Sequence, residues 1–316
     1  MIKRAEKIHS KMGDEELLLE SNSKVRWDNC PKRSGHAAFI PVNEFRRHHL
    51  PAGYQDEELK EFILSVAALT TLITVDYVSP NRPLTVSDSQ TPYPFSNRRG
   101  LFAKRTGSGM VWEVKKITEK DSEESGTCLC FQCRRSPTPR KEWGLVQVLT
   151  APHVVFDSEE VVCSKFSLFQ DSEVNETAEN SIDGVETVYT MVDNDASCIK
   201  CATHNLDLID KLETLFLKYL KLYLNVKERF KGPHIDKICI VVSHPHGYTK
   251  HVSVGTWSSS EGAGSLLPDT RYTYSTSTCP GSSGSPVFVM GTQWCPIIRP
   301  HSCSVGKNNE SSVYWG

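Results

Sequence analysis

The sequence has no long apolar run and no excess of charge of one sign. Its longest apolar candidate, residues 62–78, is interrupted by Ser, Thr and Asp, so we expect no transmembrane helix. Residues 1–20 begin with basic side chains but continue without an apolar core, which does not fit a secretory signal. The formal net charge of −2 provides no global basic excess for binding a nucleic-acid backbone. We therefore expect an intracellular protein that binds neither membranes nor nucleic acids.

The sequence also lacks the even number of cysteines that a disulfide framework would need, because it has 11. In an intracellular protein such cysteines are expected to be reduced thiols or metal ligands. The metal-ligand candidates form two closely spaced groups, the first in a polar insert at 119–141 and the second followed by His204: Cys128, Cys130 and Cys133, then Cys198 and Cys201. Thiolates in close pairs are typical of structural zinc sites, so we expect these cysteines to be ligands if zinc is bound. Free intracellular thiols are the alternative.

Two segments have the apolar spacing of a helix. In residues 56–74, apolar side chains recur every three or four positions and Pro80 closes the segment, which predicts an amphipathic helix docked on the following domain. A second apolar stripe covers residues 206–228. Residues 1–50 are polar and charged, and we expect them to be mostly flexible, with a short helix around 15–20.

Short strands dominate the remainder. Apolar and polar residues alternate, or short apolar runs lie between Gly, Pro and Ser, at residues 107–117, 143–149, 238–242, 252–257, 272–275 and 287–290. Strands at this spacing favour an all-β barrel or sandwich, into which the helix at 206–228 is inserted.

The stretch from Cys279 to Phe288, CPGSSGSPVF, surrounds Ser283 with small residues. They allow a tight turn that exposes the hydroxyl, and they let the amides of Gly281 and Ser283 point together as an oxyanion hole. The stretch resembles the G-x-S-G-[GS]-P signature of trypsin-like serine peptidases. The Thr-Ser-Thr before this stretch and Ser285 within it resemble the corresponding residues of the glutamyl endopeptidases and the high-temperature-requirement proteases. A Gly/Ser turn between strands is the alternative.

A serine nucleophile needs a general base, and His153 is the candidate. It follows a predicted strand in Leu-Thr-Ala-Pro-His, which resembles the T-A-x-H motif of the same family, and it precedes Ser283 as in that family. A structural histidine at a strand end is the alternative.

The acid that would orient His153 is less well defined. Asp207, in Asn-Leu-Asp-Leu, resembles the D-[LI]-[AL] segment of the family, but a helix follows it where the family continues in a strand. Asn205 would then cap this helix and Asp207 would be a first-turn carboxylate. We expect Asp207 to be the acid, with Asp193, Asp195 and Asp210 as the other candidates.

Two further stretches extend the resemblance. Residues 241–255 resemble a strand pair of the second barrel, with His244 and His246 in its turn. Pro300-His301-Ser302 resembles the strand that lines the primary specificity pocket, where a histidine of the glutamyl endopeptidases binds an acidic side chain. Cys303 replaces the glycine that usually follows, and a structural His301 is equally compatible.

The resemblance implies a mainly β, two-barrel chymotrypsin-like fold over residues 96–316, with helical insertions, after a helical and partly disordered extension at 1–95. It implies a serine endopeptidase that cleaves a protein or peptide substrate through an acyl-enzyme, without a cofactor. The triad would be Ser283, His153 and Asp207. The alternative is a catalytically inactive, protease-derived binding module. An α/β-hydrolase is excluded because a strand follows Ser283 and no aspartate lies between Ser283 and His301.

Overall fold

The structure is a computed structural model that describes residues 27–86, 90–121, 126–172, 178–230, 237–261, 271–290, 298–305 and 308–312. The flexible segment and short helix expected before residue 27 lie outside the described residues. In the part that is described, no helix is both long and apolar enough to cross a membrane.

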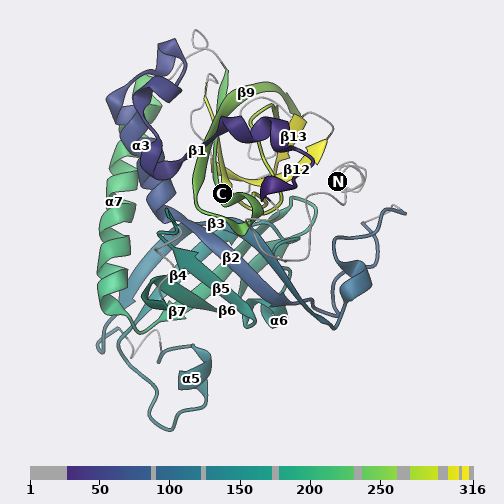
Figure 1. The fold of residues 1–316 in the computed structure, drawn as a ribbon. Helices are drawn as coiled ribbons and strands as arrows, with labels where there is room; N and C mark the ends of the chain where they lie inside the picture. Colours follow the sequence, from purple (N-terminus) through teal and green to yellow (C-terminus); the bar gives the residue numbers. More distant parts are fainter. Residues whose placement is uncertain are drawn as a thin grey trace.

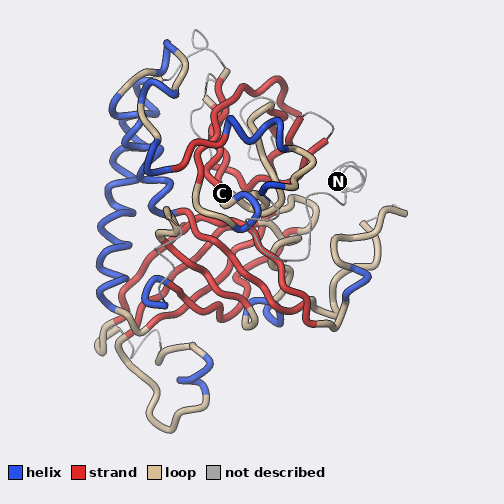
Figure 2. Tube along the Cα trace, viewed as in Figure 1, coloured by secondary structure: helices blue, strands red, loops and turns tan. Residues whose placement is uncertain are grey.

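Two closed antiparallel barrels of six strands each form the body of the molecule (Figures 1 and 2). The first has the strand order β2-β3-β4-β7-β6-β5, and its strands are β2 (Thr70–Tyr77), β3 (Phe102–Ile117), β4 (Trp143–Thr150), β5 (Ser164–Leu168), β6 (Ser181–Met191) and β7 (Ala196–Thr203). The second has the order β9-β10-β13-β12-β11-β8 and closes through β8–β9; its strands are β8 (Ile238–Ser243), β9 (His251–Glu261), β10 (Arg271–Tyr274), β11 (Pro286–Val289), β12 (Ile298–Val305) and β13 (Asn308–Ser311). This is the two-barrel chymotrypsin-like fold that the sequence predicts.

Residues before the first barrel lie across the second one. The short strand β1 (Phe39–Pro41) pairs with β9, antiparallel to its first residues. Short 3-10 helices surround it: η2 (Arg33–Ala38), η3 (Val42–Glu44), η4 (Arg47–His49) and η5 (Ala52–Tyr54). We call residues 27–56 the extension. From Trp27 onward the extension is therefore structured, where the sequence predicts flexibility up to residue 50.

Helix α3 (Glu57–Leu69) begins where the sequence predicts, since the Asp56 carboxylate accepts a hydrogen bond from the Leu59 amide at 2.9 Å. It ends earlier than predicted, because the β-branched run from Thr70 to Val75 forms β2. Because β2 pairs with both β3 and β5, the first barrel begins at Thr70, which precedes the domain start at residue 96 that the resemblance implies.

Helix α7 (Leu206–Arg229) confirms the second predicted helix. It packs along α3, as Figure 1 shows, and the rings of Phe62 and Tyr219 are stacked with their centroids 5.9 Å apart. The remaining helices are short: α5 (Phe131–Arg134), α6 (Ser158–Val161), η6 (Ser96–Arg98), η7 (Ala178–Asn180) and η8 (Pro245–Gly247).

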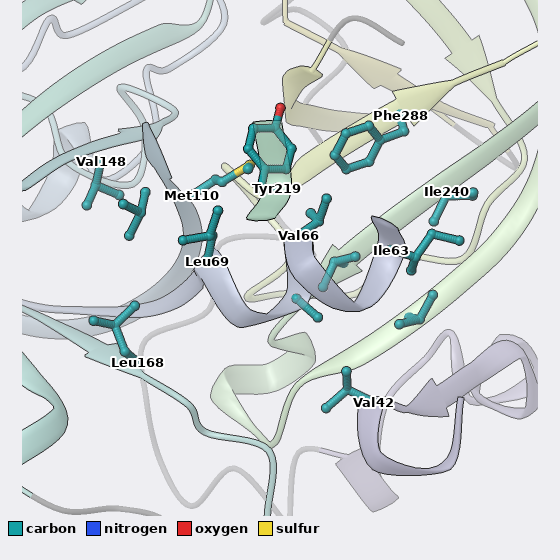
Figure 3. Packing of buried hydrophobic residues seen from close by; sticks show 14 of the residues in the cluster. Val42, Ile63, Val66, Leu69, Met110, Val148, Leu168, Tyr219, Ile240 and Phe288 are labelled. Carbon is teal, nitrogen blue, oxygen red and sulfur yellow. The ribbon is translucent and has the colours of Figure 1, made fainter. Parts of the chain in front are cut away.

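One apolar core joins both barrels and the two long helices. Figure 3 shows Ile63, Val66 and Leu69 of α3 between side chains of the first barrel, such as Val148, and side chains of the second, such as Phe288. Each fully buried side chain of this kind contributes about 1.5–3 kcal/mol to stability. Helix α3 is therefore part of the core that holds the two barrels together.

Candidate active site

His153 lies just beyond the end of β4, in the turn Ala151-Pro152-His153, and its side chain is fully buried. Its Nδ1 lies 3.0 Å from Oδ1 of Asp195, whose side chain is also fully buried. A carboxylate oxygen accepts hydrogen bonds, so Nδ1 is the nitrogen that donates to Asp195. Nε2 is then the nitrogen that can accept a proton, and it makes no hydrogen bond within the described residues.

The acid on His153 is therefore Asp195 and not Asp207. Asp195 occupies the β6–β7 turn with a left-handed backbone (φ 50°) and directly precedes β7. Asp207 lies in the first turn of α7, which Asn205 caps through a 3.1 Å hydrogen bond from the Leu208 amide. The other two candidates, Asp193 and Asp210, are exposed, as Asp207 is.

Ser283 lies in the turn before β11, and the turn contacts the end of β4. A Cβ placed on Gly284 (φ 79°) would lie 3.0 Å from the Ala151 amide nitrogen, two residues before His153. A Cβ on Gly107 of β3 would lie 2.8 Å from a methyl carbon of Val154 and 3.2 Å from the Ser283 carbonyl oxygen. The segments that carry His153 and Ser283 are thus direct neighbours across the two barrels.

The expected oxyanion-hole amides belong to the same turn. Gly281 has a left-handed backbone (φ 91°), and a Cβ there would lie 2.5 Å from the His244 carbonyl oxygen, so only glycine fits. Ser108 of β3 fixes the turn, because its hydroxyl donates to the Gly281 carbonyl at 2.8 Å and its amide donates to the Ser283 carbonyl at 2.8 Å. Among the described residues, the amides of Gly281 and Ser283 have no hydrogen-bond acceptor.

The sequence does not reveal the buried ionic network behind His153. Glu160 accepts hydrogen bonds from Arg82 at 2.6 and 2.8 Å and from Arg105 at 2.5 Å. The same arginines donate to the main chain beside the imidazole, Arg82 to the His153 carbonyl and Arg105 to the Val154 carbonyl, each at 3.1 Å. The network thus holds the backbone on which the imidazole is mounted.

Within this network the two arginines keep Glu160 charged despite its burial, whereas burial and the charge of Arg82 lower the pKa of Arg105. Burial raises the pKa of Glu160, but the hydrogen bonds and positive charges of Arg82 and Arg105 outweigh it, so the pKa lies below its usual value. Glu160 also accepts from the amides of Ser79 and Phe156, at 2.9 and 2.8 Å. Glu160 is therefore a carboxylate at neutral pH.

His301 and Ser302 lie on β12, beside the turn that carries Ser283. The Gly284 amide donates to the His301 carbonyl at 2.8 Å, and the His301 amide donates to Ser285 at 2.8 Å. Both side chains are fully buried, and His301 Nδ1 lies 2.5 Å from the Tyr274 hydroxyl. A cavity of about 370 Å³ opens nearby, but its walls are Phe39 and other residues of the extension, the segment 275–279 and Asn309. His301 and Ser302 do not line this cavity.

The predicted metal ligands separate into two groups. Cys128, Cys130 and Cys133 converge on Nε2 of His204, with Sγ–Nε2 distances of 3.2, 3.5 and 3.4 Å. They lie in the insert around α5, which Figure 1 shows at the far end of the first barrel from the second barrel. We call them the insert cluster.

Cys198 and Cys201 do not join the insert cluster, and their expected role as ligands is corrected. They lie three residues apart on β7, so their side chains point to opposite faces of the strand. The Cys198 thiol donates to Gln147 at 3.2 Å, and burial raises its pKa to about 12. Cys201 is part of the apolar core, and burial raises its pKa well above the usual value.

No family model and no curated protein matches this sequence. Among solved structures, the chain is similar to Deg5, at 12% identity and a TM-score of 0.39, covering 82% of this chain and 90% of Deg5. It is similar to the HtrA-type protease AlgW in complex with a tripeptide, at 10% identity and a TM-score of 0.41, covering 82% of this chain and 60% of AlgW. It is also similar to a serine endoprotease from Yersinia pestis, at 13% identity and a TM-score of 0.40, covering 84% of this chain and 63% of that protein. The two closed six-stranded barrels define the fold of this chain.

Proposed function

We propose that the protein is a serine endopeptidase whose triad is Ser283, His153 and Asp195. The observation that carries the proposal is the buried His153–Asp195 pair at 3.0 Å, mounted on a segment that contacts the nucleophile turn. A histidine held by a buried carboxylate through Nδ1 directs Nε2 toward a nucleophile and stabilises the imidazolium that forms during the reaction.

The proposed reaction has two halves. Ser283 Oγ attacks the carbonyl carbon of the scissile bond while His153 Nε2 takes the hydroxyl proton, and the Gly281 and Ser283 amides donate to the oxyanion. The proton then passes to the leaving amine, which leaves an acyl-enzyme. Water, deprotonated by the same nitrogen, attacks the ester and releases Ser283 with its proton restored. No metal or organic cofactor takes part in these steps.

A covalent fluorophosphonate probe tests the proposal. The wild type should be labelled, and Ser283→Ala and His153→Ala should each abolish labelling. Ser258→Ala, at an exposed serine of β9, is the matched control and should be labelled like the wild type. Absence of labelling in a folded wild-type sample would contradict the proposal.

The second candidate function is a catalytically inactive, protease-derived binding module. One observation favours it: no hydrogen bond joins Ser283 to His153 in the described structure. Nucleophile–base hydrogen bonds are often long before substrate binds, so this geometry is compatible with both functions. A folded wild type that resists the probe and still binds peptides would support the binding module.

We also propose that the insert cluster binds a structural zinc ion. Three thiolates and one imidazole are a complete tetrahedral donor set for zinc. Amide groups donate to the sulfurs, from Cys130 to Cys128 at 3.5 Å, from Cys133 to Cys130 at 3.4 Å and from Arg140 to Cys133 at 3.4 Å. Such donors would stabilise thiolates. The ion would hold together an insert whose own apolar cluster is small.

Metal analysis of the purified chain tests this site. Cys133→Ser should lose one equivalent of zinc, and Cys198→Ser, a buried cysteine outside the cluster, should retain the wild-type content. Equal zinc contents in Cys133→Ser and the wild type would contradict the zinc site while leaving the peptidase proposal intact.

A further inference from the structure

Four potential metal ligands from distant parts of the chain converge beside the nucleophile turn. Cys30 and His36 belong to the extension, His246 to the β8–β9 turn, and Cys279 to the segment that leads to Ser283. Their ligand atoms all lie within 4.8 Å of one another. Cys30, His246 and Cys279 are buried, and His36 is half-buried. We call these four residues the extension cluster.

Two distances in the extension cluster are close to those expected for a tetrahedron around a metal ion. The sulfurs of Cys30 and Cys279 are 3.7 Å apart, and Cys279 Sγ lies 3.3 Å from His36 Nε2. With Zn–S of about 2.3 Å and Zn–N of about 2.0–2.1 Å, a tetrahedral site places two sulfurs about 3.8 Å apart and a sulfur and a nitrogen about 3.6 Å apart. A disulfide would require about 2.05 Å between the sulfurs.

We propose that Cys30, His36, His246 and Cys279 bind one zinc ion. Two sulfur and two nitrogen donors form a closed tetrahedral set, which is typical of a structural site. The two thiols lose their protons on binding, so that two thiolates neutralise the charge of Zn²⁺. This site is separate from the insert cluster, at the opposite end of the molecule, and does not depend on the proposed peptidase activity.

The surroundings of the cluster fit a metal site. The Lys32 amide donates to Cys30 Sγ at 3.3 Å, which favours a thiolate. Trp27 lies against His36, with ring centroids 4.3 Å apart, and stacks on His251 at 5.1 Å, so that it covers the cluster. His246 has a left-handed backbone (φ 59°), which is uncommon for a residue other than glycine and is found at constrained functional positions.

Zinc at this site would connect the extension to the proposed oxyanion hole. Cys279 precedes Pro280 and Gly281, and its carbonyl accepts from the Ser282 amide at 2.9 Å. On the other side, the His246 amide donates to the Pro280 carbonyl, and a Cβ on Gly281 would lie 2.9 Å from the His246 nitrogen. The metal would therefore fix both flanks of the Gly281 turn, and the extension would be a part of the catalytic architecture.

Zinc content and ligand type test the proposal on the full chain. The wild type should bind two equivalents of zinc, and Cys30→Ser and Cys133→Ser should each bind one. Cys163→Ser, a half-buried cysteine outside both clusters, should bind two. The double variant Cys30→Ser/Cys133→Ser should bind none.

X-ray absorption at the zinc edge identifies the ligands even if Cys30→Ser fails to fold. The zinc that remains in Cys133→Ser should have two sulfur and two nitrogen neighbours, whereas the insert cluster would give three sulfurs and one nitrogen. Wild-type zinc with only the three-sulfur signature would overturn the proposal. A Cys30–Cys279 disulfide, detected as a mass 2 Da lower than that of the reduced chain, would also overturn it.

Zinc content, proteolysis and probe labelling together separate the extension site from the proposed peptidase activity. Loss of one zinc in Cys30→Ser, together with faster proteolysis of residues 27–56, would support the site even in a chain that the fluorophosphonate probe does not label. Probe labelling of the wild type with a single zinc of the insert type would support the peptidase and overturn the extension site.

Discussion

The two barrels hold their halves of the candidate active site by different means. In the first barrel, buried charges hold the site: Glu160 and two arginines fix the main chain at His153. In the second barrel, small residues hold the site: the turn of Ser283 contains Gly281 and Gly284, which have a left-handed backbone and pack against main-chain atoms. The position of His153 thus depends on a network that tolerates little change in charge, and the position of Ser283 depends on a turn that tolerates little change in volume.

This difference also separates what the sequence reveals from what it hides. A turn built from glycine and serine is a contiguous pattern, whereas an ionic network assembled from Arg82, Arg105 and Glu160 is scattered over the chain. Contacts in the first barrel are therefore harder to predict from the sequence, and substitutions there test the structure most directly.

The largest expected effect is on the base. Asp195→Asn keeps the shape of the side chain but favours the wrong tautomer of His153, which should lower kcat by about 10⁴-fold. Asp207→Asn, at the exposed first turn of α7, should leave kcat unchanged. Both are measured with a peptide substrate cleaved by the wild type. The reverse ranking of the two variants would reject Asp195 as the orienting acid.

The next effect is on the ionic network of the first barrel. Glu160→Gln leaves two buried arginines without a carboxylate, and removing one partner of a buried pair costs about 3–5 kcal/mol of unfolding free energy. Glu159→Gln is the matched control, because Glu159 is next to Glu160 in the chain but its side chain is exposed. It should change the unfolding free energy by less than about 0.5 kcal/mol. Urea denaturation measures both. A Glu160→Gln variant as stable as the control would mean that the network does not support the first barrel.

The corresponding change in the second barrel is Gly281→Ala. The added Cβ would meet the His244 carbonyl oxygen at 2.5 Å and turn the Gly281 amide away from the oxyanion. Loss of one such donor lowers kcat by about 10²–10³-fold. Gly100→Ala shares the left-handed backbone (φ 75°) but has no atom within 4 Å of the added Cβ, and it should retain wild-type kcat. Equal losses in the two variants would indicate backbone strain as the cause, with no specific role for the Gly281 amide.

Acid should weaken the first barrel through Glu160. Its pKa in the folded chain lies below its usual value of 4.5, so its contribution to stability is complete above about pH 4.5 and is lost as the pH falls through the folded pKa. The unfolding free energy of the wild type should therefore decrease between pH 5 and pH 3 more steeply than that of Glu160→Gln, which cannot titrate. Parallel pH profiles of the two proteins would show that Glu160 does not contribute to acid sensitivity.

The fold, and the tight turn that carries Ser283, could be predicted from the sequence because each depends on local patterns. The helix at 206–228 has a regular apolar stripe, and the residues around Ser283 form a contiguous motif. The end of the helix at 56–74 was mispredicted because Ile73 continues the helical spacing while the β-branched residues around it favour a strand.

The sequence favours Asp207 over Asp195 because of the residues that follow each carboxylate. Asp207-Leu208 resembles the D-[LI]-[AL] segment, whereas Ala196 and Ser197 follow Asp195, and only the tertiary structure places Asp195 on His153. His204 was seen beside the two cysteines of β7, yet only the β7–α7 connection brings it to the insert cluster. The extension cluster combines four residues from three segments, and such long-range convergence follows from the tertiary structure alone.

The smallest expected effect is on the helix pair that touches both barrels. Arg229 of α7 makes ion pairs with Asp56 at 2.6 Å and with Glu58 at 3.0 Å, but its side chain is half exposed, and pairs of this kind contribute about 0.2–1 kcal/mol. Arg229→Ala removes both pairs and should therefore lower the unfolding free energy by no more than about 2 kcal/mol in low salt, and the difference should shrink in 1 M NaCl. Phe62→Ala, which removes a ring packed on Tyr219 and Phe288, should cost about 3–5 kcal/mol at either salt concentration. A larger loss for Arg229→Ala than for Phe62→Ala would show that charge, as in the first barrel, holds α3 and α7 together, whereas the expected ranking assigns that role to apolar packing.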